Sequence, residues 1–195
     1  DPELEKAVTL FGREMRDPRS EDELLAEALK VAAEADVIVA ALGEASESSG
    51  ESSSKTDLTL PDTQRRLLEE LLATGKPVVM LNFSGRPTVL EWETRNVPAI
   101  LNVWFGGSEA ADAIADVVFG DVNPSGKLPF SFPARLEDNG AHHFGAISYP
   151  GDSIRQEYLE DVLVGYRWHD TKKIPALYPF GHGLSYTSFT YGKPV

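Results

Sequence analysis

The chain has 195 residues, of which 42% are hydrophobic and 25% charged, as is usual for a single globular domain. Its formal net charge of −13 argues against nucleic acid as a partner, because phosphates are bound by clustered Lys and Arg, and against adhesion to anionic membranes. The absence of Cys excludes disulfides, thiolate catalysis and Cys-ligated metal, and no apolar run approaches the length of a membrane span.

The first elements expected are two helices that flank a strand. Ser20-Glu-Asp-Glu23 has the spacing of a capping box, and apolar residues recur at helical spacing after it, which predicts a helix over 21–34. Val37–Leu42 is short and continuously apolar, a pattern typical of a strand covered on both faces in a parallel sheet. Pro61 then suits the first turn of a second helix, and Thr74-Gly75 is expected to end that helix.

The same strand-loop-helix order repeats further along the chain. Pro77–Phe83 and Pro98–Trp104 are predicted strands, with a short helix over 89–93 between them. Ser108 is expected to cap a helix over 110–119. Such repetition implies right-handed crossovers. We therefore expect an α/β fold, a three-layer sandwich with a mostly parallel sheet, ending in a loop-rich, partly β C-terminal segment.

The pattern changes after residue 120. Lys127–Phe132 is predicted to be an edge strand because it contains Pro, residues 133–160 show little periodicity, and Val162–Trp168 is a further strand candidate. The Gly- and aromatic-rich stretch Leu177–Tyr186 is expected to wrap around the domain rather than form a regular element. The expected organisation is a single domain over 1–195, made of an N-terminal remnant (1–19), a βα core (20–132) and an irregular wrapping segment (133–195).

One loop stands out, Gly43–Lys55, which follows the first buried strand and consists almost entirely of Ser, Gly and three carboxylates, Glu44, Glu47 and Glu51. Its composition is that of a flexible linker. Its position favours a functional site, because connections inside a compact βα unit are usually much shorter and long ones are usually functional. Both interpretations stay open on composition alone.

Parallel strands end at one edge of a sheet, so the loops after Leu42, Phe83 and Val103 are predicted to share a rim. That rim would bring together carboxylates, the guanidinium of Arg86 and the indole of Trp104, a combination suited to holding sugars. Two simpler interpretations remain: Arg86 pairs with a neighbouring carboxylate, and Trp104 covers the end of the sheet.

Other familiar sites are missing. The Ser-rich loop lacks the Gly and Lys spacing of a phosphate-binding loop, no Gly-x-Gly-x-x-Gly opens a helix after a strand, and no Gly-x-Ser-x-Gly is present. The four His residues lack the i, i+4 spacing of metal ligands beside a carboxylate. We therefore expect no cofactor and no metal.

Several segments, in this order and spacing, together resemble the second, α/β-sandwich domain of glycoside hydrolase family 3, the β-glucosidase and β-xylosidase group. The resemblance runs from about Asp17 to the end of the chain. The segments that carry it are Asp17–Ser20, Ala35–Glu44, Gly50-Glu-Ser-Ser-Ser-Lys-Thr-Asp-Leu-Thr-Leu-Pro61, Thr74–Val79, Ser84-Gly-Arg-Pro87, Trp104–Glu109, Ala115–Pro129 and Tyr178–Thr187.

The resemblance implies a two-part, retaining and exo-acting β-glycosidase that removes terminal non-reducing β-D-glucosyl residues from an oligosaccharide or β-glucoside. A (β/α)8 barrel would supply the Asp nucleophile and this domain the general acid/base, which the family motif matches to Glu51. Glu44 matches the Glu directly after the strand and Glu47 matches no family carboxylate. Glu44, Arg86 and Trp104 are secondary candidates for substrate binding.

The sequence also departs from the family pattern. The barrel, the usual opening strands and the following fibronectin-like domain have no counterpart in these residues, so we expect the chain to be a C-terminal portion of a longer enzyme, inactive by itself. The resemblance favours a periplasmic or secreted parent protein. The alternative function is a non-catalytic carbohydrate-binding or assembly module with the same fold.

Overall fold

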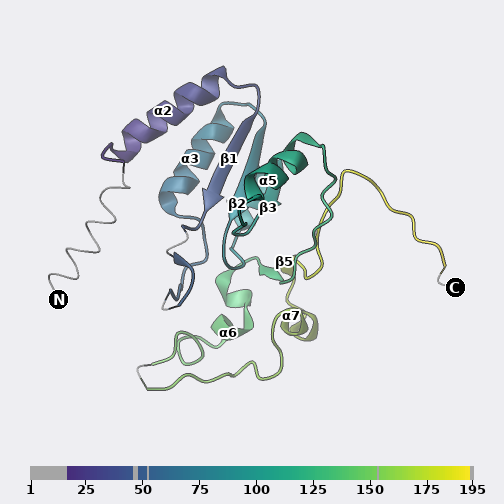
Figure 1. Ribbon diagram of the computed structural model, residues 1–195. Coiled ribbons are helices and arrows are strands. Elements are labelled where there is room, and N and C mark those ends of the chain that lie inside the picture. The colour runs from purple at the N-terminus through teal and green to yellow at the C-terminus, as the bar shows by residue number, and fades with distance from the viewer. Residues whose placement is uncertain (1–16, 46–47, 52, 153, 194–195) are drawn as a thin grey trace.

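The computed structural model describes residues 17–45, 48–51, 53–152 and 154–193 (Figure 1). Most of the expected N-terminal remnant, and Glu47, lie outside the described residues. The elements are α2 (Glu21–Glu34), β1 (Ile38–Gly43), α3 (Asp62–Ala73), β2 (Val78–Phe83), α4 (Glu91–Asn96), β3 (Ala99–Asn102), α5 (Ala110–Phe119), β4 (Phe132–Pro133), η2 (Leu136–Asp138), α6 (Gly140–His143), α7 (Tyr166–Lys172) and β5 (Ala176–Tyr178).

Strands β1, β2 and β3 form a parallel sheet in that order, with Ile38 opposite Val78 and Val79 opposite Ala99. Because neighbouring parallel strands must be joined by a crossover, α3 connects β1 to β2 and α4 connects β2 to β3. Helices α2 and α3 lie on one side of the sheet and α5 on the other (Figure 1). This confirms the expected α/β fold with a parallel sheet between helices.

Local signals set the ends of two helices where they were predicted. The backbone N–H of Glu23 donates to Ser20 Oγ at 3.3 Å, and the Glu23 carboxylate accepts from the backbone N–H of Ser20 at 2.8 Å, so the capping box is complete. Gly120 ends α5 in the left-handed conformation, with φ of 85°. The structure therefore confirms the predicted helices over 21–34 and 110–119.

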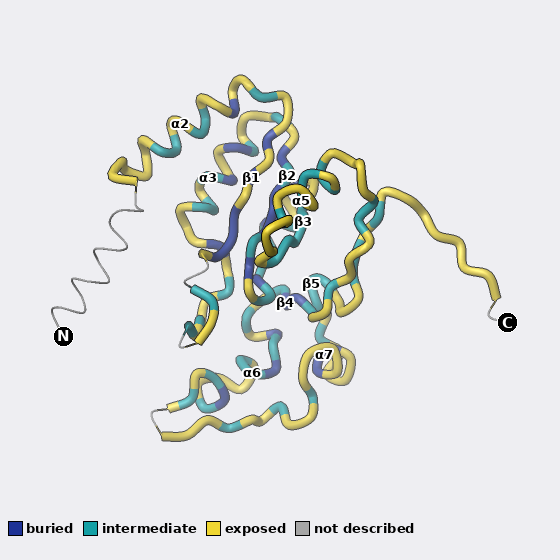
Figure 2. Tube along the Cα trace, in the orientation of Figure 1, coloured by how far each residue is buried: buried dark blue, intermediate teal, exposed yellow. Residues whose placement is uncertain are grey.

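The core lies between the sheet and the helices on the α3 side, where the buried parts of β1, β2 and α3 meet (Figure 2). Its fully enclosed side chains include Leu68 and Met80, each 0% exposed. The other buried apolar residues of this core are Ala32, Ile38, Ala40, Leu42, Leu60, Leu71, Val78, Leu90, Val97 and Phe132. Burial of this set supplies most of the driving force for the βα region.

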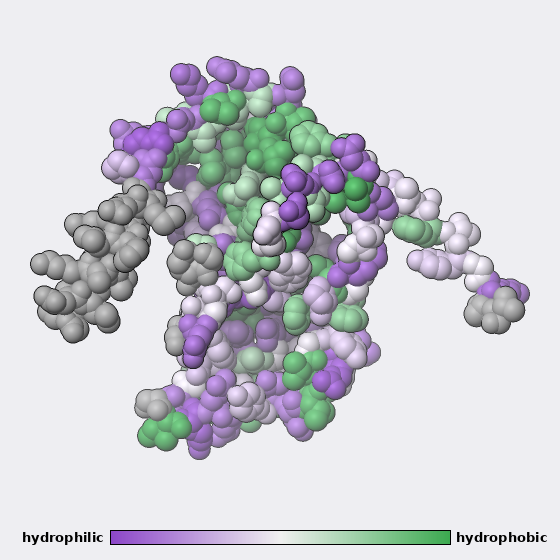
Figure 3. All heavy atoms as spheres, in the orientation of Figure 1, coloured by the Kyte–Doolittle hydropathy of each residue, from purple (hydrophilic) through white to green (hydrophobic). Residues whose placement is uncertain are grey.

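The expectation that the first strand is covered on both faces is wrong. Ile38, Ala40 and Leu42 are buried, but Val39 on the opposite face is 45% exposed. Helix α5 has no buried residue and is separated from β3 by a pocket, and this face of β1 is left uncovered, so apolar side chains gather on the surface between α2 and α5 (Figure 3). In β2 the expectation holds, because both faces of that central strand are largely enclosed.

Three boundaries differ from the prediction. The short helix is Glu91–Asn96 rather than 89–93. Glu109, not Ser108, occupies the N-cap position of α5, and no side-chain cap hydrogen bond is formed there. The edge strand predicted over Lys127–Phe132 is reduced to Phe132–Pro133, which pairs antiparallel with β5. Proline removes a ladder donor, so the pairing stays short.

The strand predicted at Val162–Trp168 is wrong. The alternation of Val162, Val164 and Trp168 resembles a strand, but both Val side chains are exposed, and Gly165, with φ of 63°, begins helix α7. Trp168 anchors this helix, because its ring is buried and its indole N–H donates to the carbonyl of Asp138 at 3.1 Å. A strand signal needs a pairing partner, and the structure places none beside these residues in the described chain.

Candidate active site at the carboxyl end of the sheet

Strand β1 lies at the edge of the sheet and ends at Gly43. On its open edge, the side chain of Gln64 from α3 pairs with the backbone of Gly43 as a neighbouring strand would. The backbone N–H of Gly43 donates to Gln64 Oε1 at 2.7 Å, and Gln64 Nε2 donates to the Gly43 carbonyl at 2.9 Å. The next backbone N–H, that of Glu44, donates to the carbonyl of Phe83 in β2 at 2.7 Å. The chain therefore leaves the sheet at a fixed point with its polar groups satisfied.

Glu44 is buried at that exit and is held by two cations. Lys55 Nζ lies 3.2 Å from Glu44 Oε1, and Arg86 Nε lies 3.3 Å from Glu44 Oε2. The Glu44 side chain is 2% exposed. A carboxylate removed from water in this way requires such partners, so the pairing with Arg86 that the sequence left open is confirmed.

Arg86 also reaches the loop that follows Glu44. Its Nη2 donates to the carbonyl of Ser48 at 2.5 Å and to the carbonyl of Ser53 at 3.2 Å. Close approach of the loop is possible because residue 85 is Gly: a Cβ there would lie 2.1 Å from Ser49 Oγ. The turn Ser84–Arg86 after β2 is thus packed against the loop after β1.

Ser84 completes the base of this cluster. Its hydroxyl is fully buried, accepts from the backbone N–H of Arg86 at 3.0 Å and lies 3.3 Å from Glu44 Oε2. Because Glu44 faces Lys55, Arg86 and Ser84 together, both of its carboxylate oxygens are engaged. Neither oxygen is directed to open solvent, so Glu44 is poorly placed to contact a substrate.

Glu51 occupies a different environment. It lies within a turn closed by the backbone hydrogen bond from Ser53 N–H to the Gly50 carbonyl, 3.2 Å, and it is exposed. The two carbonyls that Arg86 binds, those of Ser48 and Ser53, stand on either side of it in the chain. The loop therefore presents Glu51 outward while its flanks are tied to the sheet.

The exit of the loop is held by further polar contacts. The hydroxyl of Tyr149 donates to the carbonyl of Lys55 at 3.4 Å, which links the loop to the C-terminal segment. Asp57 accepts from the backbone N–H of Thr59 at 2.9 Å and from its hydroxyl at 2.7 Å. These hydrogen bonds, the backbone one foremost, lower the pKa of Asp57 and so favour its charged form.

Trp104 follows β3 and packs against two aromatic side chains, Phe130 and Phe132. Its ring meets Phe130 and Phe132 edge-on, with centroids 6.2 and 5.9 Å apart, and its φ of 55° is unusual for a bulky residue. The ring contributes to the core that includes Phe132. The simpler interpretation, that Trp104 covers the end of the sheet, is the one that these contacts favour.

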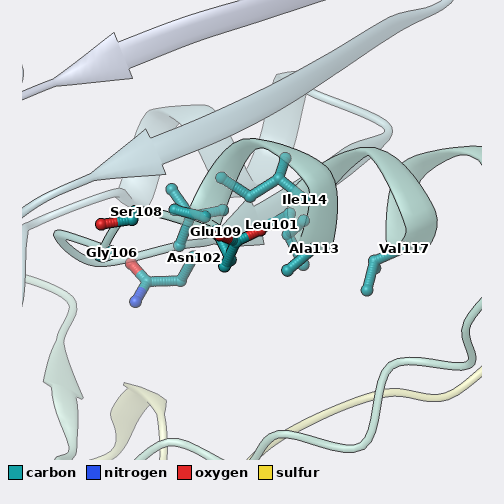
Figure 4. Close-up of a pocket in the computed structure, with 11 residues that line it drawn as sticks. Leu101, Asn102, Gly106, Ser108, Glu109, Ala113, Ile114 and Val117 are labelled. Carbon is teal, nitrogen blue, oxygen red and sulfur yellow. The ribbon is translucent and has the colours of Figure 1, made fainter.

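A pocket of about 630 Å³ opens between β3 and α5 (Figure 4). Its described lining is mainly aliphatic, with Leu101, Ile114 and Val117 along its wall, and holds no aromatic ring; Glu109 is its one carboxylate. None of the cluster residues Glu44, Arg86 and Lys55 lines it. This hollow does not have the polar and aromatic lining that a sugar site requires.

The rim predicted from the sequence is therefore formed in part. The structure brings Glu44 and Arg86 together beside the flanks of Glu51, whereas Trp104 is half-buried and packs against the core. The predicted rim covered the segments that contain Lys55 and Ser84, but the sequence did not single out either residue as a partner of Glu44. The available signal was their position, since each lies in a segment that resembles the family.

Within the described ranges, no three His, Asp or Glu side chains are grouped as metal ligands would be. The described part of the chain also contains no helix with the length and apolar character needed to cross a membrane.

Comparisons with known proteins agree on one family. The model of the glycosyl hydrolase family 3 C-terminal domain matches residues 3–186. The chain is 56% identical over 136 residues to the β-glucosidase BoGH3A of Bacteroides ovatus, covering 70% of this chain and 18% of that protein. It is 44% identical over 176 residues to a periplasmic β-glucosidase of Salmonella typhimurium, covering 89% and 22%.

Among solved structures, the β-glucosidase of Kluyveromyces marxianus in complex with glucose superposes with a TM-score of 0.79 at 34% identity. The match covers 89% of this chain and 20% of that one. The chain thus spans about a fifth of the length of the relatives it matches.

Proposed function

The chain belongs to glycosyl hydrolase family 3 and matches the C-terminal domain of that family. From that premise we propose that it supplies the general acid/base of a retaining, β-glucosidase-like enzyme. The substrate would be an oligosaccharide or β-glucoside with a terminal non-reducing β-D-glucosyl residue. The nucleophilic Asp would come from a (β/α)8 barrel in the full-length protein.

One observation supports this proposal most strongly: Glu51 is an exposed carboxyl group on a turn whose two flanks are fastened to the end of the sheet. A general acid must reach the leaving oxygen of a bound substrate and keep a defined orientation there. An exposed position with fixed flanks meets both requirements.

The same geometry supports a division of roles between the carboxylates. Retaining glycosidases place two carboxyl groups about 5–5.5 Å apart, one as nucleophile and one as acid/base. Glu44 is engaged by Lys55 and Arg86 through both oxygens and is a structural group in this proposal. The second reactive carboxyl would then be contributed from outside this chain, so the chain by itself would not hydrolyse a glucoside.

The proposal is tested in two ways, of which the second separates it from the alternative. The purified 195 residues should not turn over an aryl β-glucoside, whereas the full-length protein should. In the full-length protein, Glu51→Gln should slow cellobiose hydrolysis about 100-fold to 10,000-fold. Glu47→Gln removes the same charge from the same loop and should leave the rate close to wild type.

The alternative, a non-catalytic carbohydrate-binding or assembly module, makes the opposite prediction. It expects sugar binding by the chain alone and no effect of Glu51→Gln on hydrolysis by the full-length protein. The pocket beside α5 gives it no support, because its described lining is largely aliphatic. We further propose a periplasmic or secreted location, by similarity to the periplasmic relative of Salmonella typhimurium.

A further inference from the structure

We propose that Arg86 is a positioning residue that holds the turn carrying Glu51 in the orientation needed for proton transfer. The inference rests on the function proposed above, because it gives a role to Arg86 only if Glu51 is the acid/base.

The contacts of Arg86 bridge the two flanks of Glu51. One nitrogen, Nη2, donates both to the Ser48 carbonyl at 2.5 Å and to the Ser53 carbonyl at 3.2 Å. The turn between those two points is itself closed by the Ser53 N–H, which donates to the Gly50 carbonyl at 3.2 Å. A single guanidinium therefore sets the distance between the Ser48 and Ser53 carbonyls, which lie on either side of Glu51.

Glu44 in turn fixes Arg86. Arg86 Nε donates to Glu44 Oε2 at 3.3 Å, and the Glu44 backbone N–H donates to the Phe83 carbonyl at 2.7 Å. The Arg86 side chain is 22% exposed and that of Glu44 is 2% exposed, so water competes little for their contact. The path from the sheet to the flanks of Glu51 thus consists of directional hydrogen bonds at every step.

The chemistry of the contact requires Arg rather than Lys. The guanidinium is planar and spreads its five donors in a rigid fork, so it can serve a carboxylate from Nε and two carbonyls from Nη2 at the same time. The ammonium of Lys gathers its three donors at one point. Arg86→Lys would keep the charge and its partner Glu44 but lose the fork that joins both flanks.

The packing of the turn after β2 supports the same role. Gly85 lies so close to the loop that a Cβ would be 2.1 Å from Ser49 Oγ and 3.0 Å from Phe105 Cε2. The loop therefore also contacts the turn Ser84–Arg86 at Ser49, next to the Ser48 carbonyl that Arg86 binds, and is not held by one long side chain alone. A positioning function needs such a rigid platform.

The expected consequence is specific to proton donation. Misplacement of a catalytic group by about 1 Å costs about 100-fold in rate. The cost applies to substrates whose leaving group needs protonation, such as cellobiose. An activated aryl glucoside, whose leaving group departs without a proton, would be affected little in the glycosylation step.

The test measures kcat/KM of the full-length protein on a series of β-glucosides with leaving groups of different pKa. Arg86→Lys should lose about 100-fold on cellobiose and little on the 2,4-dinitrophenyl glucoside, in parallel with Glu51→Gln. Combining Arg86→Lys with Glu51→Gln should cause no further loss, since there is no acid left to position. Arg95→Lys, which alters an exposed Arg paired with Glu91, is the matched control and should match wild type.

Three outcomes decide the matter. A leaving-group-dependent loss that disappears in the Glu51→Gln background supports the role of Arg86. An equal loss on every substrate, or a loss that adds fully to that of Glu51→Gln, overturns it while the function of Glu51 stands. If the loss of kcat/KM in Glu51→Gln does not depend on the leaving group, the proposed function is wrong, and the role of Arg86 inferred from it is wrong as well.

Discussion

A Cβ atom on Gly43 would lie 1.8 Å from the carbonyl oxygen of Phe83, in the neighbouring strand. Gly43 also has φ of 132°, a conformation that L side chains rarely adopt. The chain can therefore leave β1 toward the Glu51 turn only with Gly at this position. The start of the loop after β1 is therefore packed directly against Phe83, the last residue of β2.

Gly43→Ala should consequently lower the free energy of unfolding by about 3 kcal/mol or more, because the backbone must move to avoid the carbonyl. Gly75→Ala is the control: its φ of 73° is also positive, but nothing lies within 4 Å of the added Cβ. There we expect a loss of about 1 kcal/mol. Denaturant unfolding of both variants measures the difference, and equal losses would contradict the account of Gly43.

Glu44→Gln should destabilise the chain, because it leaves Lys55 and Arg86 without their shared counter-charge. Both cations are partly exposed, so we expect a loss of about 2 kcal/mol rather than the full cost of a buried unpaired charge. Glu109→Gln removes an exposed carboxylate at the same end of the sheet and should change stability by less than about 0.5 kcal/mol. A Glu44→Gln variant as stable as wild type would show that the cluster contributes nothing to folding.

Glu93 provides a pH-dependent prediction. Its carboxylate is 3% exposed and lies 3.4 Å from Arg65 Nη1, and burial raises the pKa of Glu93 more than the attraction of Arg65 lowers it. A raised pKa means that the folded state binds the proton more tightly than the unfolded state. The resulting stability is fully present below the unfolded pKa, about 4.3, and is lost as pH rises through the folded pKa.

Glu93→Gln imitates the protonated form, so it should be more stable than wild type at pH 7, with the gain disappearing below about pH 4. Urea unfolding at a series of pH values measures this. Glu69→Gln removes the exposed partner of the same Arg65 and should not show the same gain. If Glu93→Gln were less stable at pH 7, the pairing with Arg65 would outweigh the cost of burial.

Helix ends and the parallel sheet could be predicted from the sequence because their causes are local. The capping box joins Ser20 to Glu23, three residues away, and Gly120 ends its helix through its own conformation. The Val162–Trp168 strand failed because alternation alone does not supply a pairing partner, and Gly165 instead opened a helix.

In the candidate site, too, some features could be predicted from the sequence and others could not. That Glu44 and Arg86 would share a rim followed from the common end of parallel strands, whereas the two loop carbonyls bound by Arg86 depend on how a long loop folds back. No spacing rule records such backbone contacts. Likewise, nothing in the order of residues showed that Trp104 would turn toward Phe130 and Phe132.

The central claim, that Glu51 is the acid/base, is tested most directly by azide. In the full-length Glu51→Gln variant, a 2,4-dinitrophenyl β-glucoside should still form the covalent glucosyl-enzyme, but water would lack the base that activates it. Azide needs no base and would attack the anomeric carbon while the enzyme carboxylate leaves. Because the intermediate is α-linked, inversion gives β-glucosyl azide.

The measurement is the anomeric configuration of the azide product, read from its proton NMR coupling, together with the rise in turnover as azide is added. The account predicts faster turnover and β-glucosyl azide from Glu51→Gln, and only glucose from Glu47→Gln. An absence of azide rescue would contradict the acid/base assignment, and α-glucosyl azide would show instead that Glu51 is the nucleophile.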